Sequence, residues 1–164
     1  WTPLKDIVQV EVSQEELVLV AAKEYLNESC FLDRGKKIIN WKEAAKLPLI
    51  TLKKGHALRS SVDVLYANAE VKPNIFFESH SNMLSYRLAA QGLGVAIIPE
   101  ITLELMEGSM EAEVYHLSVT PVQWPVMVLY REGCYIGEVE QALLDIARET
   151  MQAHKKKLWA SFAK

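Results

Sequence analysis

Four consecutive residues, Ser79, His80, Ser81 and Asn82, bring two hydroxyls, an imidazole and an amide together in this chain. A serine beside a histidine suggests a nucleophile and its base, but adjacency in sequence does not create triad geometry. The stretch precedes a helical pattern, and backbone N–H groups at a helix N-terminus attract anions. We therefore interpret these residues as a candidate anion-binding loop. The alternative is that they only cap the helix, because Ser and Asn are preferred N-cap residues.

A second polar loop stands one structural unit earlier in the chain. It contains Lys53, Lys54, Gly55 and His56, and it also precedes a helical pattern. Lysines in a loop are common on a solvated surface, so that interpretation stays open. The presence of two polar loops, each at the start of a helix, favours a binding site.

The remaining chemistry-bearing residues do not form a catalytic or metal-binding pattern. None of the four histidines stands at metal-ligand spacing from another, and no Gly-X-Ser-X-Gly motif is present. Gly92 and Gly94 follow a helix instead of opening one, which excludes a dinucleotide-binding fingerprint. Cys30 and Cys134 share no motif, so we expect free, buried thiols in a reducing compartment. The sequence therefore predicts no catalytic site, no cofactor and no metal site.

Residues 75–98 predict one complete strand–helix–strand unit. Residues 75–77 form a short apolar run typical of a buried strand, and residues 95–98 form a second one that ends at Pro99. Gly92 stands where a helix C-terminus needs a left-handed residue. The intervening helix has an apolar face that consists of Met83, Leu84, Leu88 and Ala89. This order predicts a parallel crossover.

A similar unit precedes it. Residues 49–52 are an apolar strand pattern, and apolar residues recur at helical spacing across residues 58–69. Both polar loops then follow the carboxyl ends of neighbouring strands, where open α/β sheets bind ligands.

Further strand patterns flank this central block. Residues 7–12 and 17–22 predict two strands separated by a polar turn at residues 13–16, and residues 124–130 predict another. A long helix is expected from Glu138. Early and late strands around a middle block indicate two lobes joined by two chain crossings, with a cleft as the natural site.

The composition limits the classes of function. The 164 residues include 18 Lys+Arg and 21 Asp+Glu, which gives a net charge of −3 and no basic footprint for nucleic acid. No apolar run approaches the length of a membrane span. The first residue is Trp1 instead of Met, so we expect a fragment or a processed product.

Several segments together resemble the effector-binding domain of LysR-type transcriptional regulators. The most specific is Gly92-Leu93-Gly94-Val95 followed by Ile98-Pro99, and residues 15–21, 47–52, 53–59, 62–66 and 72–79 also match. The resemblance implies an α/β fold with two lobes, like the type 2 periplasmic binding proteins, whose first lobe is incomplete here. It implies residues 1–20 as partial regulatory lobe I, 21–127 as regulatory lobe II, and 128–164 as a return to lobe I with a C-terminal helix.

The same resemblance implies a function and partners. A bacterial regulator of this kind senses a small polar metabolite in the cytoplasm, and the candidate anion-binding loop leaves open that this metabolite is an anion. It acts as a homo-oligomer and reaches DNA through a winged helix-turn-helix expected upstream. Carried over by position, the effector-binding residues are Thr51, Lys53, Lys54, Gly55, His56, Ser79, His80, Ser81 and Asn82.

This chain departs from the family pattern in two ways. The usual opening strands and helices of the first lobe are not among these residues, so we expect exposed strand edges and self-association. Ala57 stands where peroxide-sensing members have a cysteine, which argues against a thiol switch. The alternatives are a fragment of a periplasmic type 2 solute-binding protein and an α/β enzyme of the prephenate dehydratase kind.

Overall fold

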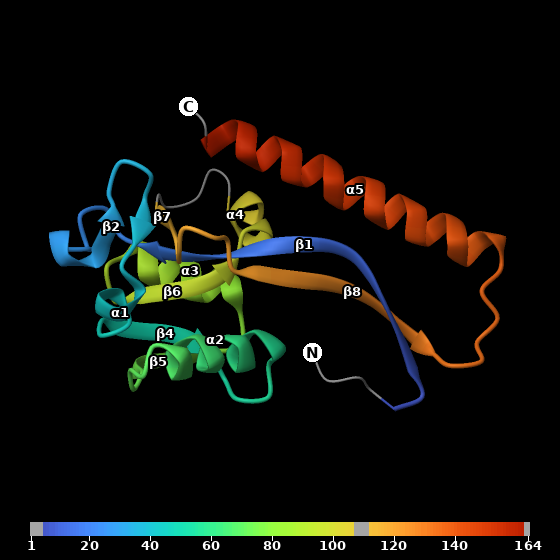
Figure 1. Ribbon diagram of the computed structural model, residues 1–164, viewed down its shortest axis with the longest axis horizontal. Coiled ribbons are helices and arrows are strands. Elements are labelled where there is room, and N and C mark those ends of the chain that lie inside the picture. The colour runs from blue at the N-terminus through green and yellow to red at the C-terminus, as the bar shows by residue number, and fades with distance from the viewer. Residues whose placement is uncertain (1–4, 107–111, 163–164) are drawn as a thin grey trace. The chain divides into compact units, whose positions relative to one another are not determined.

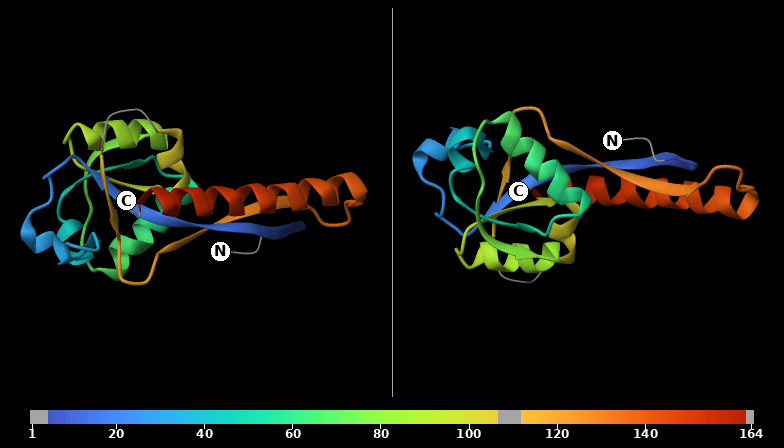
Figure 2. Two further views of the ribbon diagram at one scale, coloured as in Figure 1. Left: turned by 90° about the horizontal axis from the view of Figure 1, so that it is seen from above. Right: turned by 90° about the horizontal axis from the view of Figure 1, so that it is seen from below.

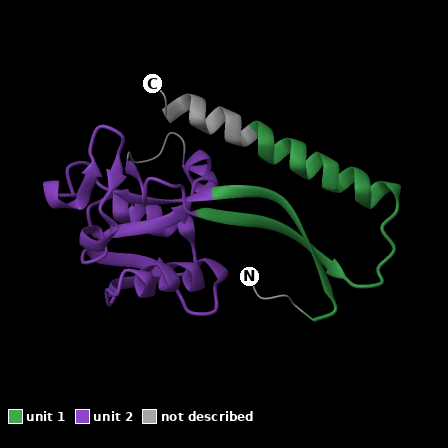
Figure 3. Ribbon diagram, in the orientation of Figure 1, with its two compact units in different colours: residues 1–15, 123–164 green, residues 16–122 purple. Residues whose placement is uncertain are grey.

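The computed structural model describes residues 5–106 and 112–162. For residues 154–162 it describes the backbone only. The chain divides into two compact units (Figure 3). Unit 1 comprises residues 1–15 and 123–164, and unit 2 comprises residues 16–122. The assignment of residues 1–20, 21–127 and 128–164 to regulatory lobes stays a prediction.

Most of unit 2 is built on one mixed sheet (Figure 1). Within the described residues the strand order is β2-β3-β7-β1-β6-β4-β5, and β8 pairs with β1. The strands are β1 (Ile7–Ala21), β2 (Phe31–Asp33), β3 (Ile38–Ile39), β4 (Pro48–Leu52), β5 (Asn74–Ser79), β6 (Val95–Pro99), β7 (Glu113–His116) and β8 (Gln123–Arg131). The helices are the 3₁₀ turn η1 (Glu28–Cys30), α1 (Trp41–Ala44), α2 (Ala57–Asn68), α3 (Asn82–Ala90), α4 (Ile101–Leu105) and α5 (Glu138–Phe162).

The predicted parallel crossovers are confirmed. Strand β4 pairs in parallel with both β5 and β6, so it is the central strand of this half of the sheet. Because the chain moves from β4 outward to β5 and then back across to β6, α2 and α3 lie on opposite faces of the sheet (Figure 2). The carboxyl ends of all three strands consequently lie at one edge.

The C-terminus of α3 shows why this part of the sequence was predictable. Gly92 has a φ of 79°, its N–H bonds to the Ala89 carbonyl at 2.9 Å, and the Leu93 N–H bonds to the Leu88 carbonyl at 3.2 Å. This is a Schellman motif, which needs a residue that tolerates left-handed backbone. A Cβ on Gly94 would stand 2.5 Å from the Pro48 carbonyl oxygen, so only glycine allows β6 to approach β4 there.

Strand β1 corrects one prediction. The expected turn at residues 13–16 is absent, and β1 runs unbroken through it. Glu16 is buried, and distant residues pair two of its polar groups: the Glu16 N–H donates to Glu100 Oε1 at 3.1 Å, and Glu16 Oε1 lies 2.8 Å from His116 Nδ1. Its second carboxylate oxygen, Oε2, has no hydrogen-bond partner among the described residues. A strand can contain buried carboxylates when distant elements supply such partners.

Two burial predictions around β5 and α3 were wrong. Ile75, Phe76 and Phe77 are exposed, because β5 is the outermost strand of its side of the sheet. In α3, Met83 and Leu84 are exposed as well. The buried residues of that helix are Ser85, Tyr86 and Ala89, because this side of α3 faces β4 and β6.

Unit 1 consists of the first part of β1, its partner β8 and helix α5. The Glu132 N–H donates to the Asp6 carbonyl at 2.9 Å and closes the far end of this strand pair. Three apolar residues of α5, Val139, Leu143 and Ile146, are exposed. No described helix is long and apolar enough to cross a membrane.

Both cysteines are free, as predicted. Cys30 is buried, and this burial raises the pKa of its thiol. Cys134 is exposed, contrary to the expectation of a buried thiol, because it lies in the loop between β8 and α5.

Candidate functional site

The two polar loops singled out in the sequence lie side by side at the carboxyl edge of the parallel strands. We call residues 53–56 the α2 loop and residues 79–82 the α3 loop. The Lys53 N–H donates to the Ser79 carbonyl at 2.9 Å, which joins the loops directly. The rings of His56 and His80 meet edge to face, with centroids 5.8 Å apart. The structure therefore gathers these predicted residues at one place.

The α3 loop is held by its own hydroxyls. The buried Ser79 Oγ donates to the Ser81 carbonyl at 3.0 Å and accepts the Ser81 N–H at 2.9 Å. Ser81 is the N-cap, and its Oγ accepts the Leu84 N–H at 3.4 Å. The capping role predicted for one of these residues is thus confirmed for Ser81, and Ser79 fixes the position of that cap.

The start of α3 also contains an unsatisfied polar atom. Asn82 Oδ1 is buried and has no hydrogen-bond partner among the described residues. A buried acceptor without a donor costs on the order of 1–3 kcal/mol. A ligand that donates a hydrogen bond to this oxygen would recover that free energy.

The α2 loop is more open. Lys53 and Lys54 are exposed, and Gly55 makes the turn with a φ of 95°. His56 is the N-cap of α2, but its side chain makes no capping hydrogen bond. Thr51 is buried in β4, opposite Glu78 of β5, and so lies beneath the loops. The first amides of α2 consequently lack the side-chain acceptor that Ser81 provides in α3.

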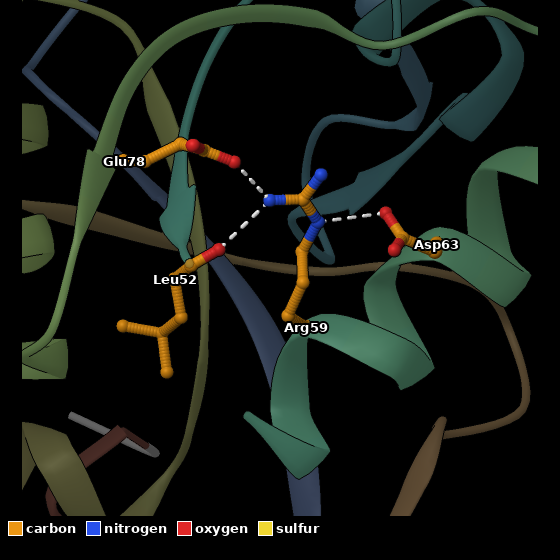
Figure 4. A network of polar contacts seen from close by, with 4 residues as sticks. All are labelled: Leu52, Arg59, Asp63 and Glu78. Atoms are coloured by element: carbon orange, nitrogen blue, oxygen red, sulfur yellow. Dashed lines mark hydrogen bonds and ion pairs between the residues drawn. The ribbon is translucent and has the colours of Figure 1, made fainter. Parts of the chain in front are cut away.

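Sequence reasoning missed the residue that anchors the α2 loop from below. Arg59 is buried, and its guanidinium bridges three elements (Figure 4). Nη1 donates to the Leu52 carbonyl at 2.9 Å and to Glu78 Oε1 at 2.5 Å, while Nε donates to Asp63 Oδ1 at 2.8 Å. Burial alone would lower the pKa of Arg59, but the contacts with Asp63 and Glu78 outweigh it and raise that pKa. The available signal was an arginine on the helix face shared by Leu58 and Val62, with an aspartate four residues on.

A second polar cluster was also missed. Glu16 and Glu100, both buried, lie where β1 passes the end of β6, and His116 of β7 contacts Glu16. The Glu100 N–H in turn donates to the Glu16 carbonyl at 2.9 Å. In the part of the chain that the structure describes, no group of three or more His, Cys, Asp or Glu side chains could hold a metal ion.

Comparison with known families identifies the domain. A family model described as the LysR substrate binding domain matches residues 2–152. An uncharacterized HTH-type transcriptional regulator of Bacillus subtilis strain 168, YybE, is 39% identical over 67 residues, which are 41% of this chain and 23% of that protein. A second such regulator from the same organism, YcgK, is 27% identical over 107 residues, 65% of this chain and 32% of that protein. The chain thus spans about a third or less of these curated relatives.

Solved structures show the same fold at low sequence identity. The effector-binding domain of QuiR in complex with shikimate has a TM-score of 0.70 at 19% identity, covering 91% of this chain and 67% of that chain. The Synechocystis PCC6803 CcmR regulatory domain in complex with 2-PG has a TM-score of 0.74 at 20% identity, covering 92% and 70%. A Corynebacterium glutamicum OxyR C206 mutant reaches 0.79 at 15% identity, covering 96% and 48%.

These findings confirm the predicted fold class, an α/β fold of the type 2 periplasmic-binding-protein kind. The relatives are transcriptional regulators and not enzymes, which agrees with the prediction. They do not favour the alternative of a periplasmic solute-binding protein. With a family model that matches most of its length, the chain belongs to the LysR substrate-binding domain family.

Proposed function

We propose that this chain is the effector-binding part of a bacterial LysR-type regulator and that the α2 and α3 loops bind a small, polar, anionic metabolite. The observation that carries the proposal is the junction of the two loops, marked by the Lys53–Ser79 hydrogen bond and the His56–His80 ring contact. Two helix N-termini converge at the same sheet edge, which is the usual ligand position in open α/β sheets.

Each predicted residue has a defined role in this proposal. Lys53, Lys54 and His56 supply positive charge or hydrogen-bond donors, and the open amides of α2 add further donors. On the α3 side, His80 and Ser81 face the ligand, Asn82 Oδ1 accepts a hydrogen bond from it, and Ser79 positions Ser81. Thr51 supports the loops from β4, and Gly55 allows the turn.

The structural neighbours support this ligand class. The QuiR domain was solved with shikimate and the CcmR domain with 2-PG. By analogy, ligand occupancy in this chain would control DNA binding by a helix-turn-helix domain in a full-length, homo-oligomeric regulator of the bacterial cytoplasm. The designation of both curated relatives as HTH-type regulators supports that arrangement.

A thermal-shift screen tests the proposal. Its panel contains monocarboxylates, dicarboxylates, hydroxycarboxylates and phosphate esters, with shikimate and 2-PG included. A compound at 100 times its Kd stabilises the fold by about 2.7 kcal/mol, which raises the Tm of a domain of this size by roughly 5 °C or more.

Variants then locate the site. For any hit, Lys53→Ala, His56→Ala and His80→Ala should each weaken binding in calorimetry, while the matched surface control Lys23→Ala should not. A hit whose affinity is unchanged by all three loop variants would place the ligand elsewhere.

Salt dependence tests the charge of the ligand. Exposed lysine contacts are screened over about 8–10 Å at moderate ionic strength, so the affinity for an anion should fall as salt rises. An affinity that is the same at low and high salt would indicate a neutral ligand held by hydrogen bonds.

A further inference from the structure

Two histidine rings meet at the junction of the loops that are proposed to bind effector. His56 is the N-cap of α2 and His80 lies in the α3 loop, and their ring centroids are 5.8 Å apart with an interplanar angle of 61°. His80 is exposed and His56 is half-buried, so neither ring is closed off from a ligand. Histidine is the side chain whose charge ordinarily changes between about pH 5 and pH 8. The site therefore contains two groups that can gain positive charge when an anion binds.

The contact between the two rings limits how many protons the pair holds. Two positively charged rings at this separation repel each other, and the repulsion grows when a ligand displaces water from the site. With one charged and one neutral ring the contact is favourable, because the edge of one ring lies against the face of the other and a positive edge meets a negative π face. The arrangement therefore suits one proton for the two rings.

The charged side chains of the neighbouring elements leave a positive balance. Glu78 of β5 and Asp63 of α2 are both paired with the buried guanidinium of Arg59 (Figure 4). Lys53 and Lys54 of the α2 loop are exposed and form no ion pair among the described residues. These three cations and two carboxylates have a net charge of +1, and one proton on the histidine pair raises it to +2. A ligand with two negative charges neutralises that balance, whereas a monoanion leaves part of it uncompensated.

Building on the proposed function, on which this inference rests, we propose that the site binds a dianion together with one proton that His56 and His80 share. Phosphate monoesters and dicarboxylates are ligands of this charge class. Because the bound state holds one proton more than the free state, affinity rises as pH falls through the range in which histidine titrates. The limit for one proton is about tenfold in affinity per pH unit.

Titration of the isotope-labelled 164-residue chain with sulfate, followed by NMR at about pH 6, 7 and 8, tests the proposal. Sulfate is the probe because it stays a dianion throughout this range, so any proton taken up goes to the protein. The amide resonances of residues 53–56 and 79–82 should shift, and the Kd should rise with pH by up to about tenfold per unit. Methanesulfonate, a tetrahedral monoanion, is the matched ligand control and should bind about tenfold or more weakly at equal ionic strength.

The histidine ring resonances locate the proton. In saturating sulfate, the rings of His56 and His80 should become protonated at a higher pH than in the free chain. His116, which contacts Glu16 away from the loops, is the control within the same spectra and should not respond to sulfate. The double variant His56→Gln/His80→Gln should bind sulfate with an affinity that no longer depends on pH, and its amide spectrum establishes that it is folded.

Several outcomes would overturn this proposal and leave the loops as the effector site. They are a sulfate affinity that does not change with pH, a change of about a hundredfold per pH unit, which means two protons, and equal affinities for sulfate and methanesulfonate. Sulfate that leaves the loop resonances unchanged, while a hit from the thermal-shift screen shifts them, has the same meaning. If no compound of that screen shifts these resonances, the loops are not the effector site and the proposed function fails as well.

Discussion

Helices α2 and α3 begin at neighbouring points of the same sheet edge, but their first turns are held by different kinds of contact. The α3 loop is held by contacts between residues close in sequence, because Ser79 and Ser81 hydrogen-bond within the loop and to the first turn of the helix. The α2 loop has no side-chain cap and depends on Arg59, which joins α2 to the Leu52 carbonyl of β4 and to Glu78 of β5. The α3 loop is therefore specified by nearby sequence, whereas the α2 loop is specified by the tertiary fold.

This difference has a consequence for ligand binding. A helix start whose amides are already capped has less to offer an anion than one whose amides are open. The α2 loop, with exposed Lys53 and Lys54, is accordingly the more available side of the proposed site. The α3 loop contributes a side that is fixed by its own hydrogen bonds and contains the unsatisfied Asn82 oxygen.

Among the variants that test this difference between the two loops, Arg59→Met should have the largest effect on stability. The variant keeps much of the side-chain volume but removes three hydrogen bonds and leaves the Leu52 carbonyl without this donor. Since Glu78 and Asp63 are 39% and 47% exposed and can regain water, the expected loss of unfolding free energy is about 2 kcal/mol. Urea denaturation measures it as a lower midpoint with an unchanged slope.

The control for this variant is Asp63→Asn, which removes only the more exposed ion pair and should cost about 0.5 kcal/mol or less. Equal losses in both variants would mean that the contacts with β4 and β5 do not hold the α2 loop.

Ser81→Ala should have a smaller effect, confined to α3. Loss of an N-cap hydroxyl costs about 1 kcal/mol. Ser60→Ala, at an exposed position inside α2, is the matched control and should change stability little. Because Ser81 is also a proposed ligand contact, calorimetry with a hit from the screen separates the roles. Unchanged affinity in Ser81→Ala would leave capping as its only function.

The same contrast explains which features the sequence alone could predict. The capping of α3 by one of its first polar residues, the Gly92 C-terminus and the parallel strand β6 follow from signals within a few residues of each feature, and they were predicted. The exposure of Phe76 depends on the order of strands in the sheet. The unbroken course of β1 through Glu16 depends on Glu100 and His116, which are distant in sequence.

The candidate site likewise contains features that nearby sequence predicts and features that only the tertiary fold determines. Both loops could be found because polar residues followed two apolar strands in parallel units. Arg59 could not be assigned, because a single arginine on a helix gives no indication of a carbonyl on β4 or a carboxylate on β5 that will receive it.

His56→Ser should change stability in the opposite direction. Serine at this N-cap can bond to an open amide of α2, as Ser81 does in α3, so the variant should gain roughly 0.5–1 kcal/mol. It should also lose ligand affinity, because it removes a proposed ligand contact and competes for the amides. A gain in stability together with unchanged affinity would show that the α2 amides take no part in binding.

Tyr66→Phe should have the smallest effect on stability at neutral pH. It tests whether another buried polar group of α2 contributes as much to stability as Arg59 does. The Tyr66 hydroxyl is buried and has no hydrogen-bond partner among the described residues. Removing it should change stability by about 0.5 kcal/mol or less, with a gain as the expected sign, because no donor or acceptor is left behind. A loss of about 2 kcal/mol would contradict this and reveal a polar contact at Tyr66 comparable to those of Arg59.

Wild type and Tyr66→Phe should diverge at high pH. Burial raises the pKa of Tyr66 in the folded state, whereas in the unfolded chain a tyrosine ionises near pH 10. Below about pH 10 the Tyr66 hydroxyl is protonated in both the folded and the unfolded state, so pH does not change the balance between them. Above about pH 10 the hydroxyl ionises in the unfolded chain but stays protonated in the fold, which stabilises the unfolded state relative to the folded state. Wild type should therefore lose unfolding free energy relative to Tyr66→Phe as pH rises above about 10.

Urea titrations of both proteins at about pH 8 and about pH 10.5, on either side of that value, measure the difference. Parallel losses in the two would mean that the Tyr66 hydroxyl ionises as freely in the fold as in water.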